Sequence, residues 1–159
     1  REQVIATLNQ WFDGVADGVA AHGGEILKFL GDGILAIFPA VPDVANACDR
    51  AVDAARQACS NVAAINEARR AEGQPPVEFG LALHLGEVSY GNVGSRHRLD
   101  FTVIGPAVNH ASRLQELTKT LGHPVLVSGA LAERTTRPLA CIGRHTLRDV
   151  ADSVEVFAL

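Results

Sequence analysis

Apolar side chains recur over the first twenty residues at the spacing of one helix face. Their separations of one, three and four positions predict an amphipathic helix that ends at Gly23-Gly24, with apolar positions Val4, Ile5, Leu8, Trp11, Phe12, Val15 and Val19. Two short apolar runs follow at residues 25–30 and 34–38, with Gly31-Asp32-Gly33 between them. Asp-Gly between apolar runs is typical of a type I′ turn, so we predict a β-hairpin.

An Ala-rich segment after the hairpin predicts a long second helix. Asp43 is a suitable N-cap, and we expect the helix to run to about Arg70, with Val44, Cys48, Val52, Ala55, Cys59 and Val62 on one face. Gly73-Gln-Pro-Pro76 predicts a loop. Strand-like sequence occupies residues 77–88, and glycines and charged residues occupy residues 89–97.

The remaining pattern alternates short strands with helices. Residues 100–104 predict a strand, and Gly105-Pro106 opens a helix that runs to about Leu121, because proline is tolerated in a first helical turn. We expect further strands at residues 125–127, 139–142 and 154–159, and a short helix at 130–135. Helices interleaved with hairpins favour an α+β fold over a doubly wound sheet. The length of 159 residues predicts one domain, residues 1–159.

Composition narrows the class of protein. Hydrophobic residues make up 47% of the chain and the net charge is -4, which excludes a disordered chain. The absence of a Lys/Arg run argues against nucleic-acid binding, and no apolar run approaches the roughly 18–20 residues of a membrane span. The 3 cysteines form no Cys-x-x-Cys pair, so we expect a reduced, cytoplasmic protein without disulfides or structural zinc.

The start of the sequence predicts a longer parent protein. The chain contains 0 methionines and opens with Arg-Glu-Gln-Val, which reads as the middle of a helix without a cap. We therefore expect an upstream region to precede residue 1. Such a region could regulate the domain or tether it to a membrane.

Two groups of polar residues could carry chemistry. Asp32 lies in the hairpin turn and Lys28 interrupts an apolar strand; a turn residue and an exposed lysine are the alternative interpretations. Asn109 and Arg113 are four residues apart near a helix start, so they project from one face. An amide and a guanidinium directed together suit a ribose and a phosphate, although a solvated helix face would have the same pattern. Thr102 is a β-branched residue in a predicted strand and does not by itself indicate a function.

Three segments together resemble the catalytic domain of the class III nucleotidyl (adenylate/guanylate) cyclases. They are residues 22–38, residues 80–88 followed by 91–94, and residues 100–113, and the closing segment 147–157 is also similar to the end of such a domain. No Walker-type phosphate loop or dinucleotide fingerprint competes with this interpretation. The resemblance implies a ferredoxin-like βαββαβ-type fold, with an antiparallel-rich sheet and packed helices. We expect the first strand of that fold to be missing from this chain.

The resemblance assigns a role to each matching position. Lys28 matches the base-selecting lysine of adenylate cyclases, and Thr102 the second base-selecting position. Asn109 matches the residue that orients the ribose, and Arg113 the one that stabilises the transition state. Arg148 lies where many members have a lysine that contacts the triphosphate.

The resemblance also implies metals and a dimer. Asp32 matches the second of two aspartates that bind two divalent cations, Mg²⁺ or Mn²⁺, and we expect the first aspartate upstream of residue 1. The family places its metal aspartates on one protomer and the other site residues on its partner, which implies a head-to-tail homodimer. Pro106 stands where the family often has aspartate, and we expect no catalytic loss from it.

The expected activity is therefore an adenylate cyclase that converts ATP to cyclic AMP and pyrophosphate. We expect residues 1–159 alone to be inactive, because the first metal aspartate lies outside them. The alternative is a non-catalytic, cyclase-like module for dimerisation or nucleotide sensing. A diguanylate-forming enzyme with a related core is disfavoured, because the chain has no Gly-Gly-[Asp/Glu]-Glu-Phe signature.

Overall fold

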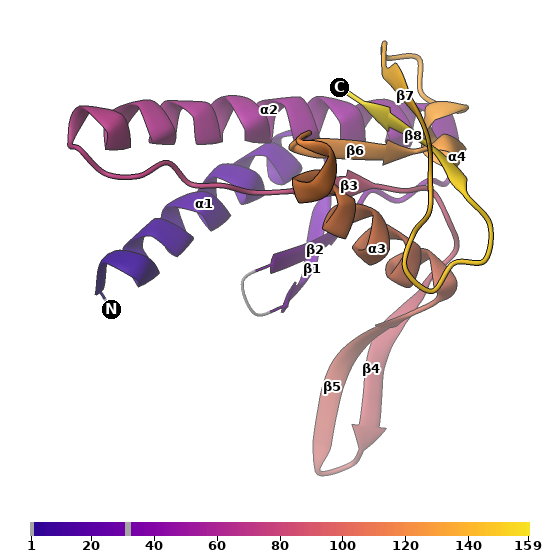
Figure 1. Ribbon diagram of the computed structural model, residues 1–159. Helices are drawn as coiled ribbons and strands as arrows, with labels where there is room; N and C mark the ends of the chain where they lie inside the picture. Colours follow the sequence, from indigo (N-terminus) through magenta and orange to yellow (C-terminus); the bar gives the residue numbers. More distant parts are fainter. Residues whose placement is uncertain (1, 31–32) are drawn as a thin grey trace. The chain divides into compact units, whose positions relative to one another are not determined.

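The computed structural model describes residues 2–30 and 33–159, and for residues 99–102 the backbone alone. The chain forms two compact units. One comprises Arg1–Phe79 with Thr135–Arg137, and the other comprises Gly80–Arg134 with Pro138–Leu159. Figure 1 shows the elements of both units in chain order. The prediction of one domain over residues 1–159 stays a prediction.

The first unit is built on two helices that pack along each other, α1 (Glu2–Ala21) and α2 (Val44–Ala71) (Figure 1). Their apolar faces supply the core: Trp11, Val15 and Val19 of α1, and mainly alanines and valines of α2. A Cβ at Gly18 would lie 3.0 Å from the carbonyl oxygen of Ala54, so glycine lets the two backbones approach closely. Both predicted helices are confirmed.

The predicted hairpin is also confirmed. β1 (Glu25–Leu30) pairs antiparallel with β2 (Gly33–Ile37), from Glu25 opposite Ile37 to Leu30 opposite Gly33. The register shifts between Ile26 and Lys28. The turn residues Gly31 and Asp32 lie outside the described residues.

A short segment from far along the sequence is held on α2. The carboxylate of Asp49 accepts hydrogen bonds from the Thr135 hydroxyl (2.6 Å), the Thr136 amide (2.7 Å) and the Thr136 hydroxyl (2.6 Å), and Arg137 makes a bidentate pair with Asp53 at 2.9 Å. Burial alone would raise the pKa of Asp49, but these hydrogen bonds lower it to about 2. The predicted helix 130–135 is therefore too long: α4 ends at Ala132, and residue 135 serves this contact instead.

The second unit contains a four-stranded sheet in the order β3 (Leu81–Leu83), β6 (Val125–Ser128), β8 (Val154–Ala158), β7 (Ala140–His145). β3 and β6 are parallel, and the other two pairings are antiparallel. α3 (Pro106–Leu121) packs on β3 and β6, and the short α4 (Gly129–Ala132) follows β6. The α+β class and the antiparallel-rich sheet are confirmed.

The sequence pattern was less informative between residues 77 and 97. Only Leu81–Leu83 of the predicted strand 77–88 is a strand. At the start of the predicted strand, the backbone of Val77 is hydrogen-bonded to the Asn66 side chain (2.6 and 3.1 Å). The glycine-containing segment β4 (Ser89–Ser95) pairs antiparallel with β5 (Arg98–Ile104) along its whole length. Cross-strand pairing thus outweighs the poor strand propensity of glycine in β4.

The Asp43 cap provides a test of the first unit. The Asp43 carboxylate accepts a hydrogen bond from the Asn46 amide at 3.0 Å, which satisfies an N–H that the helix itself cannot. We expect Asp43→Ala to lower the free energy of unfolding by about 1 kcal/mol and Asp43→Asn to change it much less. Urea unfolding measures both variants. Equal losses in the two would show that the side-chain cap is not the cause.

Candidate active site

The direction of the polar residues on α3 follows from the packing of its opposite face. Leu114 (0% exposed) and Thr118 (6%) are buried against the sheet, whereas Asn109 and Glu116 are exposed. The side chain of Arg113 keeps 26% of its surface exposed. The amphipathic pattern of this one helix therefore directs Asn109, Arg113 and Glu116 away from the core.

A glycine-proline pair sets where α3 begins. Gly105 has φ 152° and ψ 155°, a conformation open essentially to glycine alone, and a Cβ there would lie 2.9 Å from the carbonyl oxygen of Glu87. Pro106 occupies the first turn of α3, where its missing N–H removes no hydrogen bond within the helix. This start places Asn109 in the first turns of α3, and Pro106 costs the helix nothing there.

Arg113 and Arg148 meet on one carboxylate. Arg113 Nη1 donates to Glu116 Oε1 at 3.0 Å, and Arg148 Nη2 donates to the same oxygen at 2.7 Å. Arg113 Nη2 also donates to Asp149 Oδ2 at 3.3 Å. Partial desolvation raises the pKa of Glu116, but the hydrogen bonds and charges of Arg148 and Arg113 outweigh it, so the pKa lies below its usual range.

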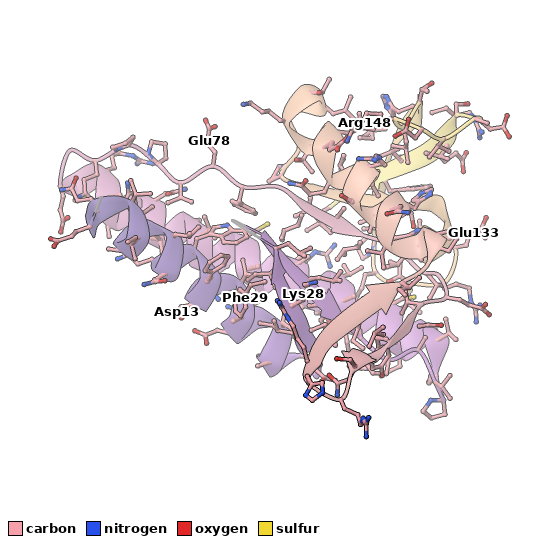
Figure 2. The ribbon with its side chains drawn as sticks, turned by 90° about the horizontal axis from the view of Figure 1, so that it is seen from below. Asp13, Lys28, Phe29, Glu78, Glu133 and Arg148 are labelled. Carbon is pink, nitrogen blue, oxygen red and sulfur yellow. The ribbon has the colours of Figure 1, made fainter. Side chains whose placement is uncertain are left out.

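Arg148 lies beside Glu116 because its sequence neighbour Leu147 is buried in the core. Leu147 is 1% exposed and belongs to the same core cluster as Leu114, so the two arginines directly adjoin two leucines of one core. The backbone then turns, with the Val150 amide donating to the Leu147 carbonyl at 3.2 Å and Asp149 at φ 61°. The Arg148 side chain is 62% exposed, and Figure 2 labels it. The structure thus brings together two of the predicted site residues.

Two histidines stack beside the start of α3. His84, directly after β3, lies 4.1 Å from His110 between ring centroids, with the ring planes 16° apart. His84 Nδ1 is 2.8 Å from the hydroxyl of the buried Ser128. Burial and the neighbouring His110 lower the pKa of His84 to about 4, and burial also lowers the pKa of His110. Sequence reasoning missed this pair, because 26 residues separate the two positions and no ligand spacing relates them.

Lys28 belongs to the first unit. It is exposed on β1 opposite Leu35, and Figure 2 labels it beside Phe29. The ring of Phe29 packs edge-on against that of Phe12, with centroids 5.2 Å apart, so this end of β1 is held on α1. The predicted base-selecting role of Lys28 stays a prediction.

Two further predicted site residues fall outside what the structure describes. Asp32 lies outside the described residues, and for Thr102 only the backbone is described, paired with Gly91 of β4. Among the side chains that the structure describes, no three of His, Cys, Asp or Glu form a group able to hold a metal ion. The described residues thus do not by themselves form a metal site, and the roles of Asp32 and Thr102 stay predictions.

The comparisons with known proteins agree on one family. No protein-family model matches the chain. The chain is 37% identical over 164 residues to adenylate cyclase 1 of Rhizobium meliloti (strain 1021), which covers 98% of this chain and 24% of that protein. It is 34% identical over 158 residues to the adenylate cyclase of Anabaena cylindrica, covering 97% of this chain and 30% of that protein. The chain thus spans about a quarter to a third of these curated relatives.

A solved structure matches over nearly the whole chain. The guanylyl cyclase Cya2 superposes with a TM-score of 0.82 at 29% identity, covering 99% of this chain and 80% of that one. By fold and sequence, the chain belongs to the class III adenylate/guanylate cyclase catalytic domains. Members of this family generally use divalent metal ions. Within the described ranges, no helix combines the length and apolar character that crossing a bilayer requires.

The stacked histidines predict how stability depends on pH. The pKa of His84 is about 4 in the folded state against the ordinary histidine value of 6.5, so the unfolded chain takes up the proton first as the pH falls. The stabilisation is complete above pH 6.5 and is lost progressively between pH 6.5 and pH 4. The full shift would correspond to about 3 kcal/mol, and solvent screening of the partly exposed ring reduces this to on the order of 2 kcal/mol. We expect His84→Asn to show a smaller loss over this window in chemical unfolding at pH 7 and pH 5. Parallel losses in the two proteins would contradict the assignment.

Proposed function

We propose that the protein carrying this domain is an adenylate cyclase that converts ATP to 3′,5′-cyclic AMP and pyrophosphate. The observation that carries the proposal is the meeting of Arg113 and Arg148 on one carboxylate, on the exposed side of a class III cyclase domain. Two guanidinium groups held this close can bind one polyphosphate through several charge-assisted hydrogen bonds. The two curated relatives named as adenylate cyclases favour ATP over GTP as the substrate.

The reaction is an internal displacement at phosphorus. The ribose 3′-oxygen forms a bond to the α-phosphorus, and the bond from that phosphorus to the oxygen that bridges the α- and β-phosphates breaks. Pyrophosphate leaves with that oxygen, and the 3′-hydroxyl proton passes to water. In phosphoryl transfer a protein acts mainly by positioning groups and neutralising charge. Arg113 would stabilise the charge that develops on the α-phosphate, Arg148 would bind the leaving pyrophosphate, and Asn109 would orient the ribose.

The base would be selected by Lys28 and Thr102. A lysine ammonium is a hydrogen-bond donor without an acceptor, so it suits the unprotonated N1 of adenine, and a threonine hydroxyl can accept from the exocyclic amine. Guanine presents the opposite pattern at these two positions. A site built to hydrogen-bond one base rejects the other, because the mismatch leaves buried polar groups unpaired.

Metal ions and a second copy complete the proposal. Asp32 is the residue of this chain that we expect to bind the divalent cations, because Mg²⁺ and Mn²⁺ prefer carboxylate oxygens. When bound, the cations would neutralise charge on the polyphosphate. We further propose a symmetric head-to-tail homodimer, in which Asp32 of one copy faces Lys28, Thr102, Asn109 and Arg113 of the other.

The first test is turnover. We expect the full-length protein to form cyclic AMP from Mn²⁺-ATP, and Arg113→Ala to lower kcat by about 10²–10³-fold, the usual cost of removing a group that stabilises transition-state charge. Arg134→Ala is the matched control, because Arg134 is an exposed arginine of the same unit outside the site. Asp32→Ala should also be inactive. A full-length protein that binds ATP without turnover would instead support the non-catalytic nucleotide-sensing module.

The second test is base selection. We expect Lys28→Glu combined with Thr102→Cys to shift the preference of the full-length enzyme from ATP towards GTP, because the exchange reverses the donors and acceptors that face the base. Initial rates with each nucleotide measure the ratio. An unchanged ratio would show that these two residues do not select the base, and it would leave the cyclase assignment intact.

A further inference from the structure

Glu116 stands between the two arginines of the candidate site. Its Oε1 accepts from Arg113 at 3.0 Å and from Arg148 at 2.7 Å, so a single oxygen fixes the separation of the two guanidinium groups. The two arginines come from different parts of the second unit, α3 and the segment between β7 and β8. Glu116 therefore links side chains that are 35 residues apart in the sequence.

The arginines need such a link to stay together. Two guanidinium groups carry like charges and repel each other, and a long arginine side chain loses considerable rotamer freedom when it is held in one place. Arg148 is 62% exposed, so the core does little to fix its guanidinium group. The hydrogen bonds that Glu116 Oε1 accepts keep this group beside Arg113, whose side chain is more deeply buried, at 26% exposure.

The link leaves donors for a ligand. A guanidinium group has five N–H donors in a planar fork. The contacts described above engage two nitrogen atoms of Arg113, with Glu116 and Asp149, and one of Arg148, with Glu116. The remaining donors can bind phosphate oxygens while Glu116 keeps its place. A carboxylate in this position can therefore orient the two arginines without blocking them.

We infer that Glu116 is a positioning residue that holds Arg113 and Arg148 together so that both bind the polyphosphate of one nucleotide. The inference deepens the proposed function and rests on it for the identity of the nucleotide. The opposite possibility is that Glu116 and Asp149 mask the arginines and compete with phosphate. The two possibilities predict opposite effects on phosphate binding when the carboxylate is removed. Masking predicts tighter binding, whereas positioning predicts weaker binding.

Substitutions at Glu116 distinguish the two in the full-length protein. We expect Glu116→Ala to lower kcat/KM for ATP by about 10- to 100-fold, the usual cost of misplacing a positioned group. Glu116→Gln keeps an oxygen at Oε1 and should stay within about threefold of the wild type, because a neutral acceptor still orients both donors, although more weakly. Glu133→Ala is the matched control, an exposed glutamate of the same unit that lies outside this cluster and is labelled in Figure 2.

Binding of inorganic tripolyphosphate, measured by calorimetry, gives a readout that does not depend on turnover. We expect Glu116→Ala to weaken this binding by about tenfold and Glu116→Gln to retain it. A wild type that makes no cyclic AMP but shows this binding pattern would overturn the proposed function and support the role of Glu116. Tighter binding in either variant, equal losses in both, or a Glu116→Ala enzyme that behaves like Glu133→Ala would overturn the role of Glu116. Thermal unfolding of each variant confirms that it is folded.

Discussion

The candidate site depends on the packing of two leucines in one core. Leu114 of α3 and Leu147 before β8 are both buried, at 0% and 1% exposure, in a cluster with Leu126 and Val156 of the sheet. Each leucine has an arginine as its direct sequence neighbour, on the side away from the core. Burial of the leucines thus brings Arg113 and Arg148 to one exposed carboxylate. The hydrophobic effect supplies the free energy that holds the two leucines in the core. The hydrogen bonds to the carboxylate then orient the two arginine side chains.

Local sequence patterns predicted much of the fold. The pairing of β1 with β2, the Asp43 cap and the glycine-proline start of α3 are all features that residues close in sequence determine among themselves. The contact of Val77 with Asn66 and the existence of β4 were not predictable in this way, because they depend on hydrogen bonds to Asn66 and to the next strand β5 rather than on the pattern of their own residues. Periodicity within a segment carries no information about such partners.

The candidate site also combines features that local sequence predicts with features that depend on the folded structure. The helical spacing of Asn109 and Arg113 indicates their shared face directly. The approach of Arg148 to Arg113, the bridge through Glu116 and the stack of His84 on His110 depend on the sheet and its connections. Local spacing could not reveal them, because their partners are distant in the sequence. The family resemblance also pointed to Arg148, but its pairing with Glu116 is visible only in the folded second unit.

The most direct test of this account is a double-mutant cycle on Arg113 and Arg148 in the full-length protein. The kcat/KM for ATP would be measured for Arg113→Ala, Arg148→Ala and the double variant. If the two arginines bind one polyphosphate as a linked pair, the loss in the double variant will be smaller than the product of the single losses by about fivefold or more, on the order of 1 kcal/mol of coupling. Losses that multiply independently would contradict the claim that the core brings the two side chains to one ligand.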